Sequence, residues 1–310
     1  MGLPLRYRSF LALFYFLSSP VFASEWLVAD AGMGMVSHAN PDSYSSIVYQ
    51  PALVALVPKY QVAVAGGIGF EEITSPDWTV GAAAVDSNSP ISMGLVYGRY
   101  LQGNSDEIQL PGWRLPDEEL SMNLLTTDVG GSLGVSFAQR TSSLGVSLLY
   151  RSNKGDQRET QEQLNVTVSA GGRLFDQLLI GVALTDLGDR FDQRGLDVGM
   201  RWGPLDPSLV KRLGSQYHDL PFRSLGGIEV DLFVPESGGL GRIGFSADCF
   251  VFDLLTLRSG VLFNHETSTG WQNPQLGFGA GVGTETSIFE YAIRHQQGFQ
   301  EHLLGVRIRL

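Results

Sequence analysis

Apolar and polar side chains alternate along most of the chain after residue 60. In QLNVTVSAG (163–171), for example, Leu164, Val166 and Val168 alternate with Asn165 and other polar or small residues. Successive side chains of a β-strand point to opposite faces, so a period of two predicts strands whose two faces differ in chemistry. The chain is therefore expected to be an all-β protein.

Segments with this alternation recur about fourteen times, and most are about 9 to 11 residues long, the length at which a tilted strand crosses a bilayer. Short turn sequences such as RTSS (140–143) separate several of them, and two longer links rich in Pro, Gly and charge lie at 102–127 and 203–220. We expect strands to begin near Tyr60, Asp77, Ser89, Asp128, Ser142, Gln161, Asp176, Gly195, Pro221, Gly241, Leu254, Pro274, Ser287 and Glu301. This series predicts an antiparallel up-and-down β-barrel.

The positions of the charged residues help to decide which face of the sheet meets water. Glu229 and Asp231, for example, share one face of the segment IEVDL (228–232). In an exported soluble sandwich such charges meet bulk water, whereas in a membrane barrel they line the lumen and the apolar face meets lipid. Alternation alone fits both alternatives. The strand lengths, and aromatic residues such as Trp78 and Trp202 near strand ends, favour the transmembrane barrel.

The N-terminal residues have the features of an export signal. Arg6 and Arg8 precede the apolar stretch FLALFYFL (10–17), and VFA (21–23) resembles a small-residue cleavage site. A buried first helix is the alternative interpretation. Cys249 is the only cysteine, so an internal disulfide framework is excluded.

The composition limits the classes of molecule that the protein could bind. With 32 acidic and 21 basic residues, the formal net charge is −11, which argues against nucleic acid as a partner. Beyond the N-terminal region no apolar stretch reaches about 18 residues, the minimum for a membrane-spanning helix. A membrane protein of this composition would have to cross the bilayer with strands.

The stretch LGFGAGVG (276–283) has a glycine at every second position. A phosphate-binding loop would need a helix directly after it, whereas the following TETSIFEYAIRH is strand-like. We interpret the stretch as a wall strand, with Leu276, Phe278, Ala280 and Val282 facing lipid and the glycines facing the lumen. Missing side chains would let the sheet curve, and would let another part of the chain approach the wall.

Several segments are similar to a known family of barrels. SADCFVFDLLTLRSGVLFN (246–264), LGFGAGVG, IFEYAIR (288–294) and HLLGVRIRL (302–310) resemble the last strands of the PorV/PorQ group, within the FadL-like outer-membrane barrels. The region 29–57 resembles the N-terminal part of the family, with Gln50, Pro51 and Ala52 where the family has an Asn-Pro-Ala element.

This resemblance implies a barrel of about fourteen strands with an N-terminal segment folded into the lumen as a plug or hatch. The expected organisation is a signal peptide at 1–23, the plug segment at 24–58 and the transmembrane barrel at 59–310. The expected location is the outer membrane of a Gram-negative bacterium, with outer-membrane lipid around the barrel.

No motif in the sequence supports catalysis. GGSLG (130–134) fits the G-x-S-x-G pattern of a nucleophile elbow, but it lies within an alternating segment, without the strand-to-helix turn that the elbow needs. The five histidines lack the spacing of metal ligands, and Cys249 has no second cysteine beside it. We therefore expect no enzymatic activity, no metal and no cofactor.

The remaining candidates are charged residues on the expected lumen face of the strands. They are Asp197, Arg201, Glu229, Asp231, Arg258, Glu290, Arg294 and Arg307, and Arg242, Asp248 and Arg309 share these faces. Because both signs occur on neighbouring strands, they are expected to form paired charges. The alternative is that they line a conduit for a polar or amphipathic substrate.

Two functions follow from the resemblance. The first is transport of hydrophobic small molecules across the outer membrane. The alternative is a non-catalytic barrel subunit or scaffold of a secretion or surface-attachment apparatus, which binds other envelope proteins through a surface formed by the links 102–127 and 203–220.

Overall fold

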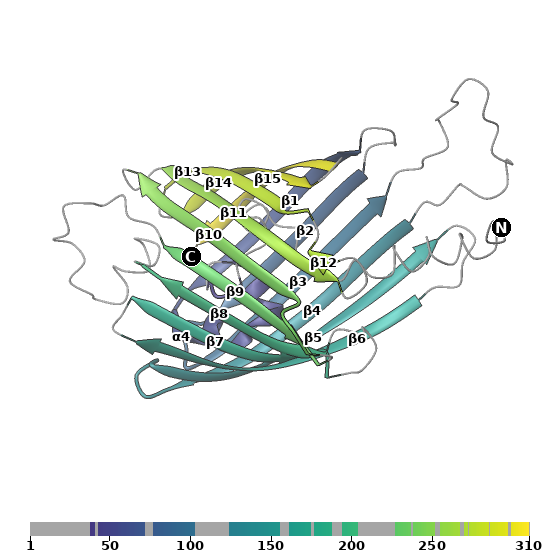
Figure 1. The fold of residues 1–310 in the computed structure, drawn as a ribbon. Coiled ribbons are helices and arrows are strands. Elements are labelled where there is room, and N and C mark those ends of the chain that lie inside the picture. The colour runs from purple at the N-terminus through teal and green to yellow at the C-terminus, as the bar shows by residue number, and fades with distance from the viewer. Residues whose placement is uncertain are drawn as a thin grey trace, which may run out of the picture.

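The alternating segments form one closed antiparallel β-barrel in the computed structural model (Figure 1). This confirms the all-β, up-and-down barrel of about fourteen strands expected from the sequence. The structure describes residues 38–40, 43–71, 77–102, 124–155, 161–174, 177–187, 194–203, 227–236, 238–251, 255–266, 270–271, 273–284, 286–296 and 299–309. The expected signal peptide (1–23) and the first part of the expected plug (24–37) lie outside these residues.

The barrel strands follow one another along the chain. They are β1 (Tyr60–Glu71), β2 (Asp77–Asp86), β3 (Ile91–Gln102), β4 (Leu124–Phe137), β5 (Ser142–Gly155), β6 (Gln161–Leu174), β7 (Leu178–Thr185), β8 (Gly195–Trp202), β9 (Ile228–Pro235), β10 (Arg242–Val251), β11 (Leu255–Glu266), β13 (Gln275–Gly283), β14 (Ser287–Gln296) and β15 (Phe299–Arg309). A two-residue strand, β12 (Gly270–Trp271), pairs with the end of β11.

Pairing between the first and last strands closes the sheet. β1 pairs with β15 from Gln61↔Arg309 to Glu71↔Phe299, and β10 pairs with β11 on the far side of the barrel. The strand starts expected at Tyr60 and Ser142 coincide with the starts of β1 and β5. The start expected near Pro221 corresponds to β9, which begins at Ile228, and residues 221–226 lie outside the described part of the chain.

The two faces of the wall have the chemistry that the alternation predicts. Large apolar side chains on the outer face are exposed, with Phe289 at 67% and Leu304 at 66%. In β13, Phe278 is 58% and Val282 is 52% exposed, whereas the alternate glycines turn to the other face. The apolar side chains of the wall strands therefore point mainly outward, as in a barrel whose outer face meets lipid rather than water.

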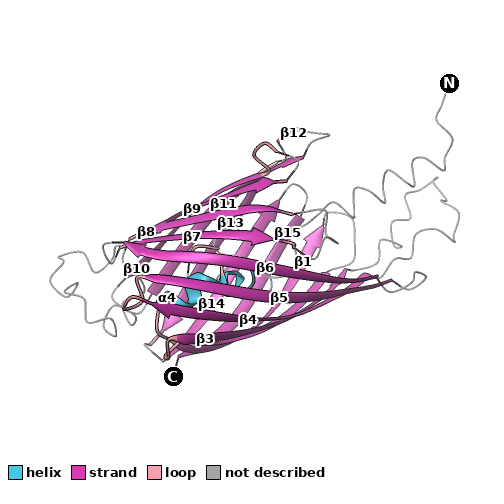
Figure 2. Ribbon diagram, turned by 90° about the horizontal axis from the view of Figure 1, so that it is seen from below, coloured by secondary structure: helices cyan, strands magenta, loops and turns pink. Residues whose placement is uncertain are grey.

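Two short helices, α3 (Ser45–Tyr49) and α4 (Pro51–Leu56), lie inside the ring of strands (Figure 2). Pro51 at the first position of α4 suits a helix start, since its missing N–H would have no partner within the helix. All six residues of α4, PALVAL, are buried, as expected for a helix that is apolar on every side. None of the helices among the described residues is long and apolar enough to cross a membrane.

The two long links leave opposite ends of the barrel. In an up-and-down barrel successive connections alternate between its ends. The link from Gln102 to Leu124 joins β3 to β4, and the link from Trp202 to Ile228 joins β8 to β9. An odd-numbered and an even-numbered connection start from opposite ends, and the links themselves, 103–123 and 204–226, lie outside the described residues.

Candidate functional site

The described residues 38–40 and 43–59, here called the inner segment, lie against the lumen face of the wall. α4 contacts strands β3 to β7, and α3 contacts β3 to β6. Leu53, Val54, Leu56 and Val57 are almost completely buried, and burial of each such side chain is worth about 1.5–3 kcal/mol. Gln50, Pro51 and Ala52, the residues singled out by the family resemblance, are all buried at the start of α4.

A row of glycines forms the surface on which the inner segment rests. This glycine track consists of Gly94 in β3, Gly134 in β4, Gly145 in β5, Gly171 in β6, Gly181 in β7 and Gly199 in β8. Gly134 pairs directly with Gly145, and Gly181 pairs with both Gly171 and Gly199.

The glycine track has no room for side chains. A Cβ atom at Gly145 would lie 2.5 Å from the Ala52 nitrogen and 2.7 Å from the Pro51 carbonyl carbon. At Gly94 it would lie 2.6 Å from Ile47 Cγ2. Real Cβ contacts are essentially never this short, so the inner segment can reach the wall only where side chains are missing.

Serines beside the glycine track hydrogen-bond the backbone of the inner segment. Ser169 Oγ accepts from the Ala52 N–H at 2.9 Å, and Ser143 Oγ donates to the Ala52 carbonyl oxygen at 2.7 Å. Ser147 Oγ donates to the Val48 carbonyl oxygen. The first N–H groups of a helix have no partner within the helix, and for Ala52 the wall supplies one.

Four of the eight predicted lumen residues form a charge cluster on β8 and β9 together with residues of β10. This cluster, called the β8–β10 cluster, contains Asp197, Arg201, Glu229, Asp231, Arg242 and Asp248. All six are buried. Arg201 Nη2 donates to both oxygens of Asp248 at 3.0 and 2.9 Å, and Arg242 Nη2 donates to Asp197 Oδ2 at 2.5 Å.

The β8–β10 cluster also binds the N-terminal end of the inner segment. The His38 N–H donates to Asp231 Oδ2 at 3.0 Å, and the next N–H, of Ala39, donates to Glu229 Oε1 at 2.7 Å. Gln50 Nε2 donates to Asp197 Oδ1 at 3.0 Å. Carboxylates two residues apart on one strand face thus bind consecutive peptide groups.

Three further predicted residues form a second cluster, on β11, β14 and β15. Arg258 Nη1 donates to Glu290 Oε1 at 2.6 Å, and Arg307 Nη2 donates to the same oxygen at 2.5 Å. Arg258 lies two strands from Glu290, and β13 runs between them with Gly279 opposite Arg258 and Gly281 opposite Glu290. Because these glycines of LGFGAGVG have no side chains, the Arg258 and Glu290 side chains can meet above β13.

Tyr44 of the inner segment lies near the second cluster and is hydrogen-bonded to β1. The hydroxyl of Tyr44 accepts a hydrogen bond from Gln61 Nε2 of β1. Complete burial raises the pKa of the Tyr44 hydroxyl above its usual value, although the nearby positive charge of Arg307 acts in the opposite direction. Tyr44 therefore stays protonated and packs as a neutral side chain.

Two further ion pairs bridge adjacent strands. Arg294, the last of the eight predicted residues, pairs with Glu301 at 2.7 Å, and Thr79 Oγ1 of β2 donates to the same Glu301. Asp128 and Arg151, directly opposite each other on β4 and β5, pair at 2.9 Å. This second pair is not among the residues expected from the sequence, although the alternation places both residues on the lumen face.

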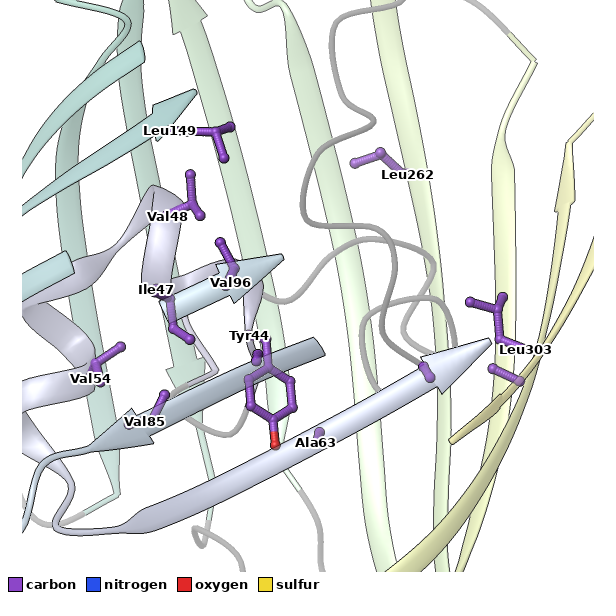
Figure 3. Close-up of a cluster of buried hydrophobic side chains, with 13 residues drawn as sticks. Tyr44, Ile47, Val48, Val54, Ala63, Val85, Val96, Leu149, Leu262 and Leu303 are labelled. Carbon is purple, nitrogen blue, oxygen red and sulfur yellow. The ribbon is translucent and has the colours of Figure 1, made fainter. Parts of the chain in front are cut away.

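The lumen face is not uniformly polar. A cluster of buried apolar residues joins Tyr44, Ile47, Val48 and Val54 of the inner segment to side chains of the wall (Figure 3). The wall residues are Ala63, Ala65, Ala83, Val85, Val96, Leu149, Leu262, Ala292 and Leu303. The lumen residues expected from the sequence are mainly charged and small, and the alternation of the flanking positions is the signal that could have placed these apolar ones. Among the described residues, no group of His, Cys, Asp and Glu could hold a metal ion.

Arg140, in the turn between β4 and β5, holds the C-terminal end of the inner segment. Its guanidinium donates to the carbonyl oxygens of Ala55 at 3.2 Å and Ser87 at 2.8 Å, and to those of Asn88 and Ser89 in the β2–β3 turn. Ala138, Gln139 and Arg140 all have positive φ, a left-handed conformation that costs about 1–2 kcal/mol per residue. This strained turn directs Arg140 towards the four carbonyl groups.

Arg140→Ala is expected to lower the free energy of unfolding by about 1.5–3 kcal/mol, because hydrogen bonds from a charged donor are lost. The urea midpoint of the purified barrel in detergent measures the effect. Gln139→Ala is the control, since its exposed side chain leaves the same turn beside Arg140. Equal midpoints for both variants would show that the four contacts contribute nothing.

Comparisons with known proteins identify the fold. No protein-family model and no curated protein matches the chain. Among solved structures, the barrel is similar to the toluene transporter TodX of Pseudomonas putida, with a TM-score of 0.59, 10% identity and coverage of 94% of this chain and 98% of that chain. It is also similar to the CymD monoaromatic hydrocarbon channel, with a TM-score of 0.59, 10% identity and coverage of 94% and 97%. The chain therefore shares the barrel fold of these two proteins, which is consistent with the FadL-like resemblance of its sequence.

Proposed function

We propose that this chain is an outer-membrane barrel that passes hydrophobic small molecules, and that the inner segment is its plug. The observation that carries the proposal is the apolar helix α4, which is packed inside the barrel on a wall of glycines. A water-filled porin has a polar interior. Here the apolar cluster of Figure 3 gives the inner side of the wall the chemistry that a hydrophobic solute would favour.

The similarity to TodX and CymD supports this proposal, since both are described as transporting or conducting aromatic hydrocarbons. The exposed apolar side chains on the outer face support a lipid environment, because a soluble protein rarely exposes such a continuous apolar surface. The N-terminal signal and the PorV/PorQ-like segments support export to the outer membrane of a Gram-negative bacterium. Within this proposal the two charge clusters hold the wall and the plug in place, and neither is assigned to substrate binding.

Reconstituted protein tests the proposal. Proteoliposomes containing the full chain are expected to take up a radiolabelled monoaromatic hydrocarbon or a fatty acid faster than empty liposomes. They are expected to swell no faster than empty liposomes in arabinose, because the plug closes the lumen to hydrophilic solutes. Uptake equal to that of empty liposomes for every apolar probe would reject transport.

The alternative is a scaffold subunit of a secretion or attachment apparatus. It is favoured by the ion pairs and helices that fill the described interior, because a filled barrel need not conduct anything. Since the two long links leave opposite ends, a scaffold of this kind would offer separate surfaces on the two sides of the membrane. Co-purification of defined envelope proteins together with absent hydrocarbon uptake would favour this alternative.

A further inference from the structure

The wall of the barrel changes height abruptly between β6 and β7. β6 has 14 residues and β7 has only 8, and the pairing of the two strands stops at Val168↔Leu184. On its other side, β6 pairs with β5 as far as Asn153↔Gln161. β5 and β6 therefore continue past the end of β7 (Figure 2). Residues 161–167 of β6, here called the open edge, pair with a described strand on the β5 side only.

The chain turns away from β6 directly after β7. Asp186 has a φ of 56°, in the left-handed region that Asp adopts more readily than most residues. Its N–H donates to the side chain of β6, at Asn165 Oδ1, instead of to the backbone. The Leu187 N–H then donates to the Val166 carbonyl oxygen at 3.0 Å. Beyond Val166, no described residue continues the backbone ladder on this side of β6.

The alternation of a β-ladder shows which backbone groups face the open edge. The N–H and C=O of one residue point to the same neighbouring strand, and those of the next residue point to the other. Because the Val166 carbonyl points to the β7 side, the groups of Glu162 and Leu164 do so too, and those of Gln163 and Asn165 point to β5. The open edge thus presents two N–H and C=O pairs, without a backbone partner among the described residues.

The side chains beside the open edge differ between the two faces. Glu162 and Leu164 are exposed on the outer face, whereas Asn165 and Thr167 are buried on the lumen face. Backbone groups without partners do not face the hydrocarbon of a bilayer, so the open edge belongs beyond the lipid-facing band of the wall. A strand added here would meet polar side chains on one face, and an acidic and an apolar side chain on the other.

The link after β7 is too short to cover the open edge and return to the barrel. It joins Leu187 to Arg194, directly before β8. From Val166 to Glu162 the edge is about 13 Å long at about 3.3 Å per residue, so pairing along it and returning needs about 26 Å of chain. The steps from Leu187 to Arg194 extend by at most about 25 Å, which leaves nothing for the turn.

We infer that the open edge of β6 is a docking site for an extended segment of another polypeptide, which joins the sheet as an additional antiparallel strand. In such strand addition, main-chain hydrogen bonds provide affinity and alternate side chains provide specificity. The partner segment would carry a basic residue opposite Glu162, an apolar one opposite Leu164 and polar ones opposite Gln163 and Asn165. This inference goes beyond the proposed transport and does not depend on it.

Amide hydrogen exchange in the free protein tests whether the edge is open. The full chain in detergent is studied by NMR. The N–H of Leu164 is expected to exchange at least about ten-fold faster than those of Gln163 and Asn165, which bond to β5. Val168 is the control, because its N–H points to the same side as that of Leu164 but has β7 beside it. A Leu164 N–H as protected as that of Asn165 would mean that this chain covers its own edge, which overturns the docking site.

A peptide of the stated chemistry tests the docking itself. The probe is a fluorescently labelled pentapeptide, VTVTK, whose lysine would lie opposite Glu162 in an antiparallel arrangement. Binding to the full chain in detergent is followed by fluorescence anisotropy. N-methylation of the central valine is expected to weaken binding by about ten-fold, because it blocks an N–H that points to β6. N-methylation of the second residue is the control, since that N–H points away from β6.

Two variants of one residue separate the backbone from the side chain. Leu164→Pro removes the N–H that faces the open edge, a change that an edge strand tolerates. It is expected to weaken peptide binding by about ten-fold, whereas Leu164→Ala keeps the N–H and should bind within about three-fold of the wild type. Both variants must give the heat-modifiable folded band. If Leu164→Pro does not fold, Glu162→Pro and Glu162→Ala replace the pair.

The results for transport and for docking are independent of each other. Equal binding by the proline and alanine variants, or no binding of the peptide to the wild type, overturns the docking site and leaves the proposed transport untouched. Binding that depends on the N–H groups supports the docking site even in a barrel that takes up no hydrocarbon. In that case the open edge would give the scaffold alternative a defined contact.

Discussion

Gly145→Ala is expected to displace α4 from the wall and to make the barrel leak hydrophilic solutes. The added Cβ would lie 2.5 Å from the Ala52 nitrogen and 3.0 Å from Ala52 Cα, which are backbone atoms and cannot rotate away. Overpacking of this kind costs about 1–3 kcal/mol when the surroundings can adjust. Here the adjustment is a movement of α4, which also breaks its hydrogen bonds to Ser169 and Ser143.

Liposome swelling in arabinose measures the leak, and the urea midpoint measures the loss of stability. Gly172→Ala on β6 is the control, because the nearest atom to its added Cβ is the Thr141 carbonyl oxygen at 3.9 Å. The control variant should behave as the wild type in both assays. A Gly145→Ala barrel that stays closed and equally stable would show that the glycine track does not position the inner segment.

The sequence alone predicted the wall well, because the period of two fixes which residues share a face. Glu229 and Asp231 were assigned to the lumen from alternation, and both are buried there. Phe278 and Val282 were assigned to the outer face, and both are exposed. Which face of the sheet a side chain occupies depends only on its position in the alternation along one strand, and the sequence shows this alternation directly.

Partners across the barrel could not be predicted in the same way. The pair Asp128–Arg151 follows from the β4–β5 register. Arg258, in contrast, pairs with Glu290 across an intervening strand and not with Asp248, its direct neighbour in the β10–β11 register. The choice depends on side-chain length and on the space above the β13 glycines, neither of which alternation encodes. The prediction of paired charges was therefore confirmed in kind, while the individual pairs had to come from the structure.

The small residues were the least informative part of the sequence. The glycines in LGFGAGVG are regular in the sequence, yet the glycines that support the inner segment are spread singly over β3 to β8. Only the register brings Gly134 beside Gly145, and Gly181 between Gly171 and Gly199. Similarly, Arg140 lies in a turn whose sequence, QRTS, gives no sign of the four carbonyl groups that it binds. Long-range proximity of this kind is a property of the closed barrel.

The charged and glycine-rich features have a common physical basis. A barrel interior that contains helices needs some wall positions without side chains and others with long ones, because the helices lie against one side. Glycines lie under α4 on β4 to β7, and most of the buried arginines extend from β8, β10, β11, β14 and β15, with Arg151 on β5 as an exception. The arginines require buried carboxylates as partners, so the charge clusters follow from the off-centre position of the inner segment.

Glu290→Ala tests how strongly these clusters hold the wall. Glu290 is the carboxylate shared by Arg258 and Arg307, and Arg309 also contributes to its electrostatic environment. Its removal leaves this group of guanidiniums without that negative charge, and breaking one partner of a buried ion pair costs about 3–5 kcal/mol. The variant is expected to show the lowest urea midpoint of the substitutions considered, and to lose its heat-modifiable folded band at a lower temperature.

Glu236→Ala provides the comparison for this loss. Glu236 pairs with Arg194 at 3.7 Å, but its side chain is 68% exposed, and such surface pairs contribute about 0–1 kcal/mol. The two variants remove the same chemical group from a carboxylate–arginine pair, one inside the barrel and one at its rim. A midpoint for Glu290→Ala no lower than that for Glu236→Ala would mean that water in the lumen solvates Arg258 and Arg307 as well as the carboxylate does. The second cluster would then be an accessible part of the lumen, and its arginines would become candidates for contact with a solute under the proposed transport.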